Sequence, residues 1–513
     1  MSLAESTRVP PLAVGDGWTA RLDRAVSRTP GRTTVLVLFV FAIVWLTELA
    51  RTSRVPAVDN LEQLIWSRAA AWGYYKHPPL PTVLMRLAVQ VGGLDAWTSY
   101  LLGAATILGG LALYWRLLLE LRGPRYAHLG LLAALCITFY NGRLNWYNHN
   151  TVLLVIVAAL ALFAWRAFER GQLRWWLGVG VALGLGALTK YQVAVTGISL
   201  ACFWLARGGW QQRVHRIGAL LAALVALVLF TPHLLWLRTH DFGPVTYAMD
   251  TSLGAGLSAR ARTLHALTWL ADAVLNRAGP ALLLLAIVGS LSKRHTHAAR
   301  ATAGAAGERW RASRQLLFAW GVVPLLFVTL LGTFSGADLQ MQWSTSFLLF
   351  LVPCVMELAP EGFWDKVSIR LAWPVFAAVQ ALLLVINVET SPIGAHPDHQ
   401  WRSFSAQRLA ARLAAPARER LGGPIRVIVG PTAEAGALAL QLPERPLVLV
   451  DGRYDRSPWV SPDLVAACGA LQIVEADRAP HGMQALGADF RGLYWRVLPA
   501  KGHAQGCSGA TRR

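Results

Sequence analysis

Long apolar runs separated by short polar connections make up most of the chain. The runs lie at 33–50, 96–119, 126–140, 147–168, 175–206, 215–237, 277–292, 315–333, 342–358 and 367–388. A helix needs roughly 20 apolar residues to cross the hydrocarbon core of a bilayer. The run at 175–206 is too long for one crossing and is interrupted at Lys190, so we divide it into two short helices with Lys190 at the turn. The pattern predicts an all-α polytopic membrane protein with about eleven crossings.

The two ends of the chain depart from this pattern. Residues 1–32 are polar and basic, and the run that follows them is either a signal-peptide core or a retained helix. We favour the helix, because no small-residue cleavage site follows the run. The membrane domain then covers 33–389. Beyond it, short apolar stretches alternate with Ala-rich helical stretches, which predicts a small α/β domain over 390–513. The short apolar stretches lie at 425–430, 447–450 and 471–474.

The basic residues predict how the chain is oriented. With the N-terminus inside, every short inner connection is basic, as membrane proteins prefer. If 175–206 were one crossing, the most basic connection, at 293–314, would lie outside, so the charges support the division at Lys190. The outer face then carries the loop at 51–95, the turn at 141–150 and the loop at 238–276, together with the C-terminal domain. The loop at 238–276 either covers a site or is merely solvated.

Composition narrows the class of protein further. The chain of 513 residues is 55% hydrophobic and 15% charged, whereas soluble chains carry about 25% charged residues. An ordinary soluble enzyme, a disordered protein and a disulfide scaffold are therefore excluded. The net charge of +20 reflects Arg in the connections between apolar runs rather than a nucleic-acid site. An oxidising outer compartment allows Cys468 and Cys507 to pair, and two free thiols are the equal alternative.

The first outer loop, 51–95, holds the residues with the clearest chemistry. Asp59 and Glu62 lie one turn apart on a predicted interface helix. The sequence GYYKHPPL follows at 73–80, and its two prolines hold Lys76 and His77 in an extended turn at the membrane surface. Cations beside a carboxylate suit a lipid-phosphate substrate, with the cations binding phosphate and the carboxylate acting as a base.

Simpler interpretations of the same residues remain open. Asp59 is also suited to cap the N-terminus of the interface helix, where Asp is favoured. Lys76 is long enough to reach lipid headgroups from an otherwise apolar surface. His77 is then a structural hydrogen-bond donor. Lys190 is either functional, as an isolated Lys in an apolar stretch suggests, or an anchor that fixes the topology.

The first-loop sequence resembles that of the polytopic GT-C glycosyltransferases of the family 39 and family 83 type. These include protein O-mannosyltransferases and the lipid A aminoarabinose and galacturonic acid transferases. Their loop carries Asp-Glu, an aromatic-rich helix and a Gly-(His/Tyr)-Tyr-x-(His/Lys)-Pro-Pro-Leu segment. The spacing matches that from Asp59 to Gly73, which gives Asp59 the family's catalytic position. Asn60 replaces the usual Glu, and whether Glu62 compensates is open.

Three further segments follow the order of the family's motifs. The sequence NWYNHNTVLL at 145–154 has Asn150 where many relatives carry a second Asp. The sequence GLGALTKY at 184–191 is similar to a Gly-rich helix that ends in Ser/Thr-Lys, which places Lys190 in the motif. Gln342-Trp343 resembles a His-Trp pair of the family. The resemblance covers roughly 33–390, and the C-terminal domain has no match.

The resemblance implies an enzyme at the outer face of a bacterial inner membrane. It would move a sugar from a polyprenyl-phosphate carrier to an envelope lipid, glycan or protein, inverting the sugar by direct displacement. The implied catalytic residues are Asp59 and Glu62. The implied donor-phosphate ligands are Lys76, His77, Lys190 and Arg86. The implied positioning residues are Asn60, Tyr74, Tyr75, His149, Asn150, Gln342 and Trp343.

Other functions and a metal requirement stay open at this stage. A transporter, a flippase or a non-catalytic binder of lipid-linked saccharides is the alternative. Transporters often contain inverted repeats, and the GYYKHPPL segment has no second copy in the chain, which favours the enzyme. We expect no resident metal ligands, although some GT-C enzymes use a divalent ion. No Walker or Rossmann motif suggests a nucleotide partner.

Overall fold

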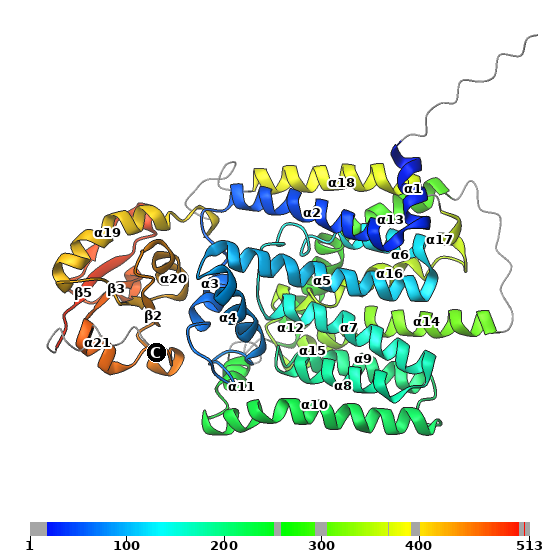
Figure 1. The fold of residues 1–513 in the computed structure, drawn as a ribbon, viewed down its shortest axis with the longest axis horizontal. Coiled ribbons are helices and arrows are strands. Elements are labelled where there is room, and N and C mark those ends of the chain that lie inside the picture. The colour runs from blue at the N-terminus through cyan, green and yellow to red at the C-terminus, as the bar shows by residue number, and fades with distance from the viewer. Residues whose placement is uncertain are drawn as a thin grey trace, which may run out of the picture.

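The computed structural model describes residues 18–250, 258–292, 305–367, 369–390, 401–501 and Cys507. Figure 1 shows a bundle of long helices that run side by side, with a small domain of helices and strands at one end. The first helix, α1 (Trp18–Arg28), lies at the opposite end of the bundle from this C-terminal domain. The predicted fold class, a helical membrane protein with a small α/β domain, is confirmed.

Within the described ranges, six helical segments are long and apolar enough to cross a membrane. They are α2 (Pro30–Thr52), α5 (Ala96–Arg122), α7 (His149–Arg170), α10 (Arg213–Thr239), the stretch Gly307–Ser335 in α14 (Ala305–Gly321) and α15 (Val323–Ser335), and α18 (Ile369–Glu389). A seventh arises if Ala259–Arg277, formed by α12 (Ala259–Ala271) and η2 (Asp272–Arg277), joins α13 (Gly279–Ser292) across a 53° bend. The predicted outer loop at 238–276 is therefore partly helical.

The count of about eleven crossings is not confirmed, and two apolar runs account for part of the difference. The run at 126–140 forms the short helix α6 (Pro124–Ala134), and the run at 342–358 forms η4 (Met341–Ser344) and α16 (Leu348–Met356). Every residue of α6 from Tyr126 onward is buried. A short helix surrounded by protein is as apolar as a helix surrounded by lipid, so hydropathy does not distinguish the two.

The predicted division of the run at 175–206 is confirmed. The run forms α8 (Leu173–Ala187) and α9 (Val193–Ala206), and Lys190 lies in the break between them. The backbone N–H of Leu80, the first residue of α4 (Leu80–Gly92), donates to the carbonyl of Leu188 at 2.9 Å. This bond ties the break to the first outer loop, so that Lys190 and the GYYKHPPL segment share one region of the molecule.

The C-terminal domain has a five-stranded sheet in the order β2-β1-β3-β5-β4. The strands β1 (Val427–Gly430), β2 (Leu447–Val450) and β3 (Ala470–Val474) are parallel, and β5 (Tyr494–Leu498) runs antiparallel to β3 and to β4 (Gln484–Ala485). The helices α19 (Ala406–Leu421), α20 (Thr432–Gln441) and α21 (Pro462–Cys468) complete the domain. The three apolar stretches that the sequence marked out each coincide with one of the parallel strands to within two residues.

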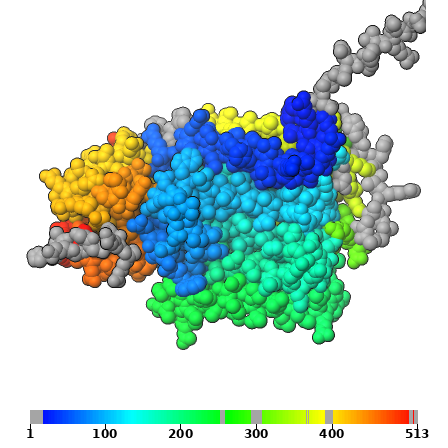
Figure 2. Space-filling model, viewed as in Figure 1, coloured from blue at the N-terminus to red at the C-terminus, as the bar shows by residue number. Residues whose placement is uncertain are grey.

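This domain packs directly on the first outer loop, where the space-filling view of Figure 2 shows it against the blue surface of the loop. The helix α3 (Val58–Trp66) contacts α20, and a Cβ on Gly436 would lie 2.9 Å from Cδ1 of Ile65. Because α3 is buried from Asn60 to Trp66, protein covers the apolar side that the sequence assigned to the membrane interface. The helix itself was predicted correctly, but the domain covers its apolar side.

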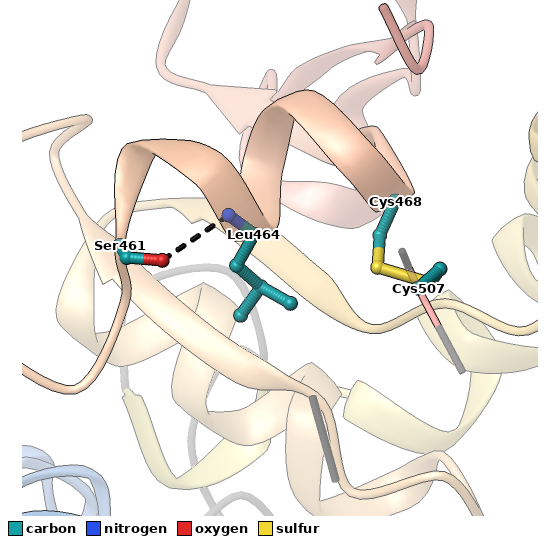
Figure 3. Close-up of a disulfide and its surroundings, with 4 residues drawn as sticks. All are labelled: Ser461, Leu464, Cys468 and Cys507. Atoms are coloured by element: carbon teal, nitrogen blue, oxygen red, sulfur yellow. Dashed lines mark hydrogen bonds between the residues drawn. A yellow bond between two sulfur atoms is a disulfide. The ribbon is translucent and has the colours of Figure 1, made fainter. Parts of the chain in front are cut away.

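A disulfide joins Cys468, at the end of α21, to Cys507 (Figure 3). At the start of the same helix, the Ser461 hydroxyl accepts a hydrogen bond from the Leu464 N–H at 3.1 Å. Of the two alternatives that the sequence left open, the structure contains the disulfide. The other three cysteines, Cys136, Cys202 and Cys354, are free.

We expect the disulfide to form in cells if the C-terminal domain lies in an oxidising compartment. Maleimide labelling of the denatured chain should modify three cysteines without reductant and all five after reduction, as counted by intact mass spectrometry. A variant with Cys468→Ser and Cys507→Ser is the control and should take up three labels in both conditions. Five labels on the unreduced wild type would place the domain in a reducing compartment.

Candidate active site

A cavity of about 640 Å³ lies where the first outer loop meets the ends of the membrane helices. Its walls come from α3, the Lys76–Pro78 turn, the start of α7, the break between α8 and α9, α11 (Gly243–Ala248), α15 and η4. One part of the wall is apolar and includes Val195, Phe327, Val328 and Leu331. The remainder is polar and charged. The arrangement suits a ligand with an apolar portion and an ionic group.

Nine of the residues predicted from the sequence line this cavity. They are Asp59, Glu62, Lys76, His77, His149, Asn150, Lys190, Gln342 and Trp343. Pro244 and Tyr247 also line it, so α11 covers the site, which was one of the two alternatives for the loop at 238–276. Sequence reasoning did not single out Asn148 or Gln192, which also contribute. Asn148 lies inside the NWYNHN motif, and that motif was the available signal.

Asp59 lies in the first turn of α3 and is held by Asn148. The Nδ2 of Asn148 donates to Oδ2 of Asp59 at 2.7 Å. The Oδ1 of Asn148 accepts from the backbone N–H groups of Asn150 and Thr151 and caps α7, which fixes the direction of the amide. The N-cap of α3 is Ala57, so the capping role considered for Asp59 is wrong. Its carboxylate is available to the cavity.

Glu62 and Lys76 form an ion pair across the cavity wall, with 2.6 Å between Oε1 and Nζ. Burial raises the pKa of Glu62, and the Lys76 charge opposes that shift. Burial also disfavours the Lys76 ammonium, but the Glu62 carboxylate outweighs it and keeps the pKa of Lys76 above its ordinary value. The ammonium lies 5.3 Å from the ring centre of Tyr75 and 5.6 Å from that of Tyr247. Glu62 therefore orients Lys76.

Lys190 has neutral partners only. Its Nζ donates to Oδ1 of Asn150 at 2.7 Å, and Nδ2 of Asn150 donates to Oε1 of Gln342 at 3.3 Å. The ammonium lies 5.7 Å from the ring centre of Trp343. Among the ion pairs of the described residues, none involves Lys190. Its ammonium therefore has no direct ion-pair partner, although the Asp59 carboxylate acts on it at longer range, and this favours an anionic ligand there.

His77 and His149 lie against each other near this cation, with 3.8 Å between their ring centres and 39° between their planes. Burial, reinforced by the charges of Lys190 and Lys76, lowers the pKa of His77 well below its ordinary value. His77 is therefore neutral near pH 7, and a neutral imidazole contacts an anion through a hydrogen bond. The predicted contact of His77 with the donor phosphate stays a prediction.

Four of the predicted residues lie outside the lining of the cavity. Arg86 donates to the carbonyl of Ser67 at 3.1 Å, so the structure does not support the expected contact with donor phosphate. Tyr74 stacks on Trp66, with 5.0 Å between ring centres. The ring of Tyr75 contacts the Lys76 ammonium. Asn60, the fourth, is fully buried.

Asn60 fixes the turn that leads into α7. Its Nδ2 donates to Oγ of Ser99 at 3.0 Å and to the carbonyl of Asn145 at 2.8 Å, and its Oδ1 accepts from the Tyr147 N–H at 2.9 Å. The turn carries Asn148, so Asn60 positions the partner of Asp59 from a distance. Its role is structural, whereas the sequence suggested substrate positioning.

The cavity offers few ligands for a divalent cation. Its carboxylates are Asp59 and Glu62, and Glu62 is engaged by Lys76. Hard cations prefer six or more oxygen ligands. Over the described ranges, no three His, Cys, Asp or Glu side chains gather as a metal site.

The fold matches that of a solved bacterial protein. It is similar to the crystal structure of ArnT from Cupriavidus metallidurans bound to undecaprenyl phosphate, with a TM-score of 0.60 and 14% identity over 90% of this chain and 97% of that one. The apo structure of the same protein gives a TM-score of 0.54. Residues 76–236 match the model of the dolichyl-phosphate-mannose-protein mannosyltransferase family.

Curated relatives agree with this assignment. The chain is 24% identical to the lipopolysaccharide core galacturonosyltransferase RgtA of Rhizobium johnstonii over 77% of each chain. It is 26% identical to the lipid A galacturonosyltransferase RgtD of the same organism, over 38% of this chain and 41% of the relative. Together these comparisons identify the chain as a membrane glycosyltransferase of the GT-C superfamily, which confirms the resemblance found in the sequence.

Replacing Asn60 should destabilise the fold, because Asn60→Ala removes three buried hydrogen bonds and leaves the Tyr147 N–H without an acceptor. We expect a loss of about 2–4 kcal/mol in the free energy of unfolding. Denaturant unfolding in detergent micelles measures it, with the exposed Gln441→Ala as the control. A loss no larger than that of the control would contradict the structural role.

Proposed function

We propose that the protein transfers a sugar from a polyprenyl-phosphate donor to an anionic envelope glycolipid at the outer face of the bacterial inner membrane. The observation that carries the proposal is the shared cavity of Asp59 and Lys190, which places a carboxylate and a cation without an ion-pair partner beside an apolar wall. The undecaprenyl phosphate in the ArnT structure supports a lipid-phosphate donor. The names of the relatives support the lipopolysaccharide core or lipid A as acceptor and galacturonic acid as the first sugar to test.

The donor binds through its phosphate and its lipid. Lys190 and the remaining N–H groups of Lys76 donate to the phosphate oxygens, while Glu62 keeps Lys76 oriented. The first isoprenyl units lie along the apolar wall formed by α9 and α15. Negative charge develops on the leaving phosphate oxygen in the transition state, and the two ammonium groups stabilise that charge.

The acceptor attacks from the side of Asp59. A hydroxyl oxygen of the acceptor forms a bond to C1 of the sugar as the bond from C1 to the phosphate oxygen breaks. The hydroxyl proton passes to the Asp59 carboxylate, and polyprenyl phosphate leaves with the bonding electrons. Because Asn148 occupies Oδ2 of Asp59, the other oxygen, Oδ1, is the one directed to the acceptor. Displacement in one step inverts the configuration at C1.

The orientation follows from the basic connections. We infer a cytoplasmic N-terminus and a periplasmic C-terminal domain, since Arg166, Arg170 and Arg174 lie at the connection between α7 and α8. The cavity lies beside the C-terminal domain and so faces the periplasm. A lipid-linked sugar reaches it from the outer leaflet.

Asp59→Asn should abolish transfer, with a loss of about 100-fold or more, because the amide accepts no proton from the acceptor. The measurement is mass spectrometry of envelope lipids from cells that lack the gene, complemented with each variant. Asp95→Asn is the matched control, since Asp95 caps α5 outside the cavity and Asn caps equally well. Full restoration by Asp59→Asn would favour a transporter or a binder of lipid-linked saccharides.

Lys190→Gln should weaken donor binding. Loss of one charge-assisted contact to phosphate is expected to raise the KM for the donor by about tenfold or more and to leave the KM for the acceptor unchanged. Kinetics of the purified enzyme with varied polyprenyl-phosphate sugar measure this. The exposed Lys501→Gln carries the same change in charge and should behave as wild type. An unchanged donor KM would remove Lys190 from the phosphate site.

A further inference from the structure

Three arginines gather around Arg143, on which the charge of Asp59 acts, and all three lie outside the lining of the cavity. Arg143 lies in the turn before α7, Arg277 ends η2, and Arg402 lies in the segment Trp401–Ser403 that leads into the C-terminal domain. None of the three lines the cavity that holds Lys76 and Lys190. All three are partly exposed. They come from widely separated parts of the chain, so the fold itself brings these like charges together.

Aromatic contacts and hydrogen bonds connect the three arginines. The guanidinium carbons of Arg143 and Arg277 lie 5.1 Å and 5.3 Å from the ring centre of Phe139. Arg402 donates to the carbonyl of Gly142, the residue before Arg143, at 3.4 Å and to Oδ1 of Asn387 at 3.0 Å. The charges of Arg277, Arg402 and Asp59 all act on Arg143.

The guanidinium of Arg143 is half-buried, and its N–H groups have no hydrogen-bond acceptor among the described residues. Its guanidinium carbon lies 4.4 Å from the ring centre of Trp146, so the group makes cation–π contacts with two aromatic rings. Burial, together with the Arg277 charge, lowers the pKa of Arg143 to about 10. Stacking satisfies the faces of a guanidinium but leaves its in-plane donors open.

The surrounding carboxylates do not neutralise the cluster. Asp272 pairs with Arg277 at 3.0 Å between Oδ2 and Nε. Asp59 acts on Arg143 electrostatically, but the two form no ion pair within 4 Å. Of the three guanidinium groups, that of Arg277 is thus the one that forms an ion pair with a described carboxylate. An arrangement of this kind is stabilised by an anion that the protein does not itself supply.

We propose that Arg143, Arg277 and Arg402 form a subsite for an anionic group of the acceptor, a phosphate or a carboxylate, next to the carboxylate that receives the acceptor proton. This rests on the proposed function, because it assigns an acceptor to the same reaction. Asp59 acts on Lys190 as well as on Arg143. The two cationic groups therefore divide the substrates: Lys76 and Lys190 bind the donor phosphate, and the three arginines bind the acceptor.

A binding measurement that needs no turnover tests the subsite. The probes are lipopolysaccharide from cells that lack the gene, and undecaprenyl phosphate, each titrated against the full chain in detergent micelles. Arg143→Gln should weaken lipopolysaccharide binding by about tenfold or more and leave undecaprenyl phosphate binding within about twofold. Lys190→Gln should give the reverse. Lipopolysaccharide dephosphorylated with hydrogen fluoride separates the two sources of charge: loss of the Arg143 effect indicates phosphate, and its retention indicates carboxylate.

The controls separate recognition from folding and from general charge. Arg143→Lys keeps the charge and should recover part of the affinity, and thermal unfolding reports whether each variant is folded. Arg453→Gln makes the same change in charge at an exposed position of the C-terminal domain and should bind both probes as wild type. Unchanged lipopolysaccharide binding by Arg143→Gln, or an equal loss for both probes, overturns the subsite. The proposed function fails separately, if Asp59→Asn supports transfer.

Discussion

The site depends on the burial of one short helix from two sides. The helix α3 has nine residues, and isolated helices below about 12–15 residues are marginal in water. Its Leu61, Ile65 and Trp66 belong to the hydrophobic core of the C-terminal domain. On the other side, Leu64 packs with Met85, Tyr147 and Val152 of the membrane part. The C-terminal domain and the helical bundle therefore stabilise α3 together, although α3 and the C-terminal domain lie far apart in the sequence.

This double burial determines the chemistry of the cavity. Because α3 is fixed along its length, Asp59 and Glu62 reach the same cavity from successive turns, yet their surroundings differ. Glu62 is buried and neutralised by Lys76, whereas Asp59 is partly exposed and held by a neutral amide. The second ammonium, that of Lys190, donates to the side chain of Asn150. The family resemblance implies that many relatives carry Asp at this position. A carboxylate there would cancel the charge that the donor phosphate needs.

Local patterns predicted the parts of the structure that depend on local chemistry. The break at Lys190, the helix that carries Asp59 and the three parallel strands follow from hydropathy and turn residues, and all were found. The predictions that the structure did not confirm concern features that depend on tertiary packing. The run at 126–140 is enclosed by protein rather than by lipid, and α3 is covered by a domain whose position no local pattern reveals. Arg86 donates to the Ser67 carbonyl, a contact between residues of two different helical segments. The roles of the cavity residues remain predictions.

The two lysines and the three arginines are contributed by different segments of the chain, and this bears on how the acceptor specificity of such enzymes changes. The segment 76–236, which matches the family model, contains Lys76, Lys190 and Arg143. Arg277 and Arg402 lie beyond it, and Arg402 belongs to the segment that enters the C-terminal domain. If the donor site resides in the shared segment and the acceptor site is completed from outside it, the acceptor can change while the donor chemistry is kept. A domain that must already pack on α3 to hold Asp59 is well placed to carry that second function.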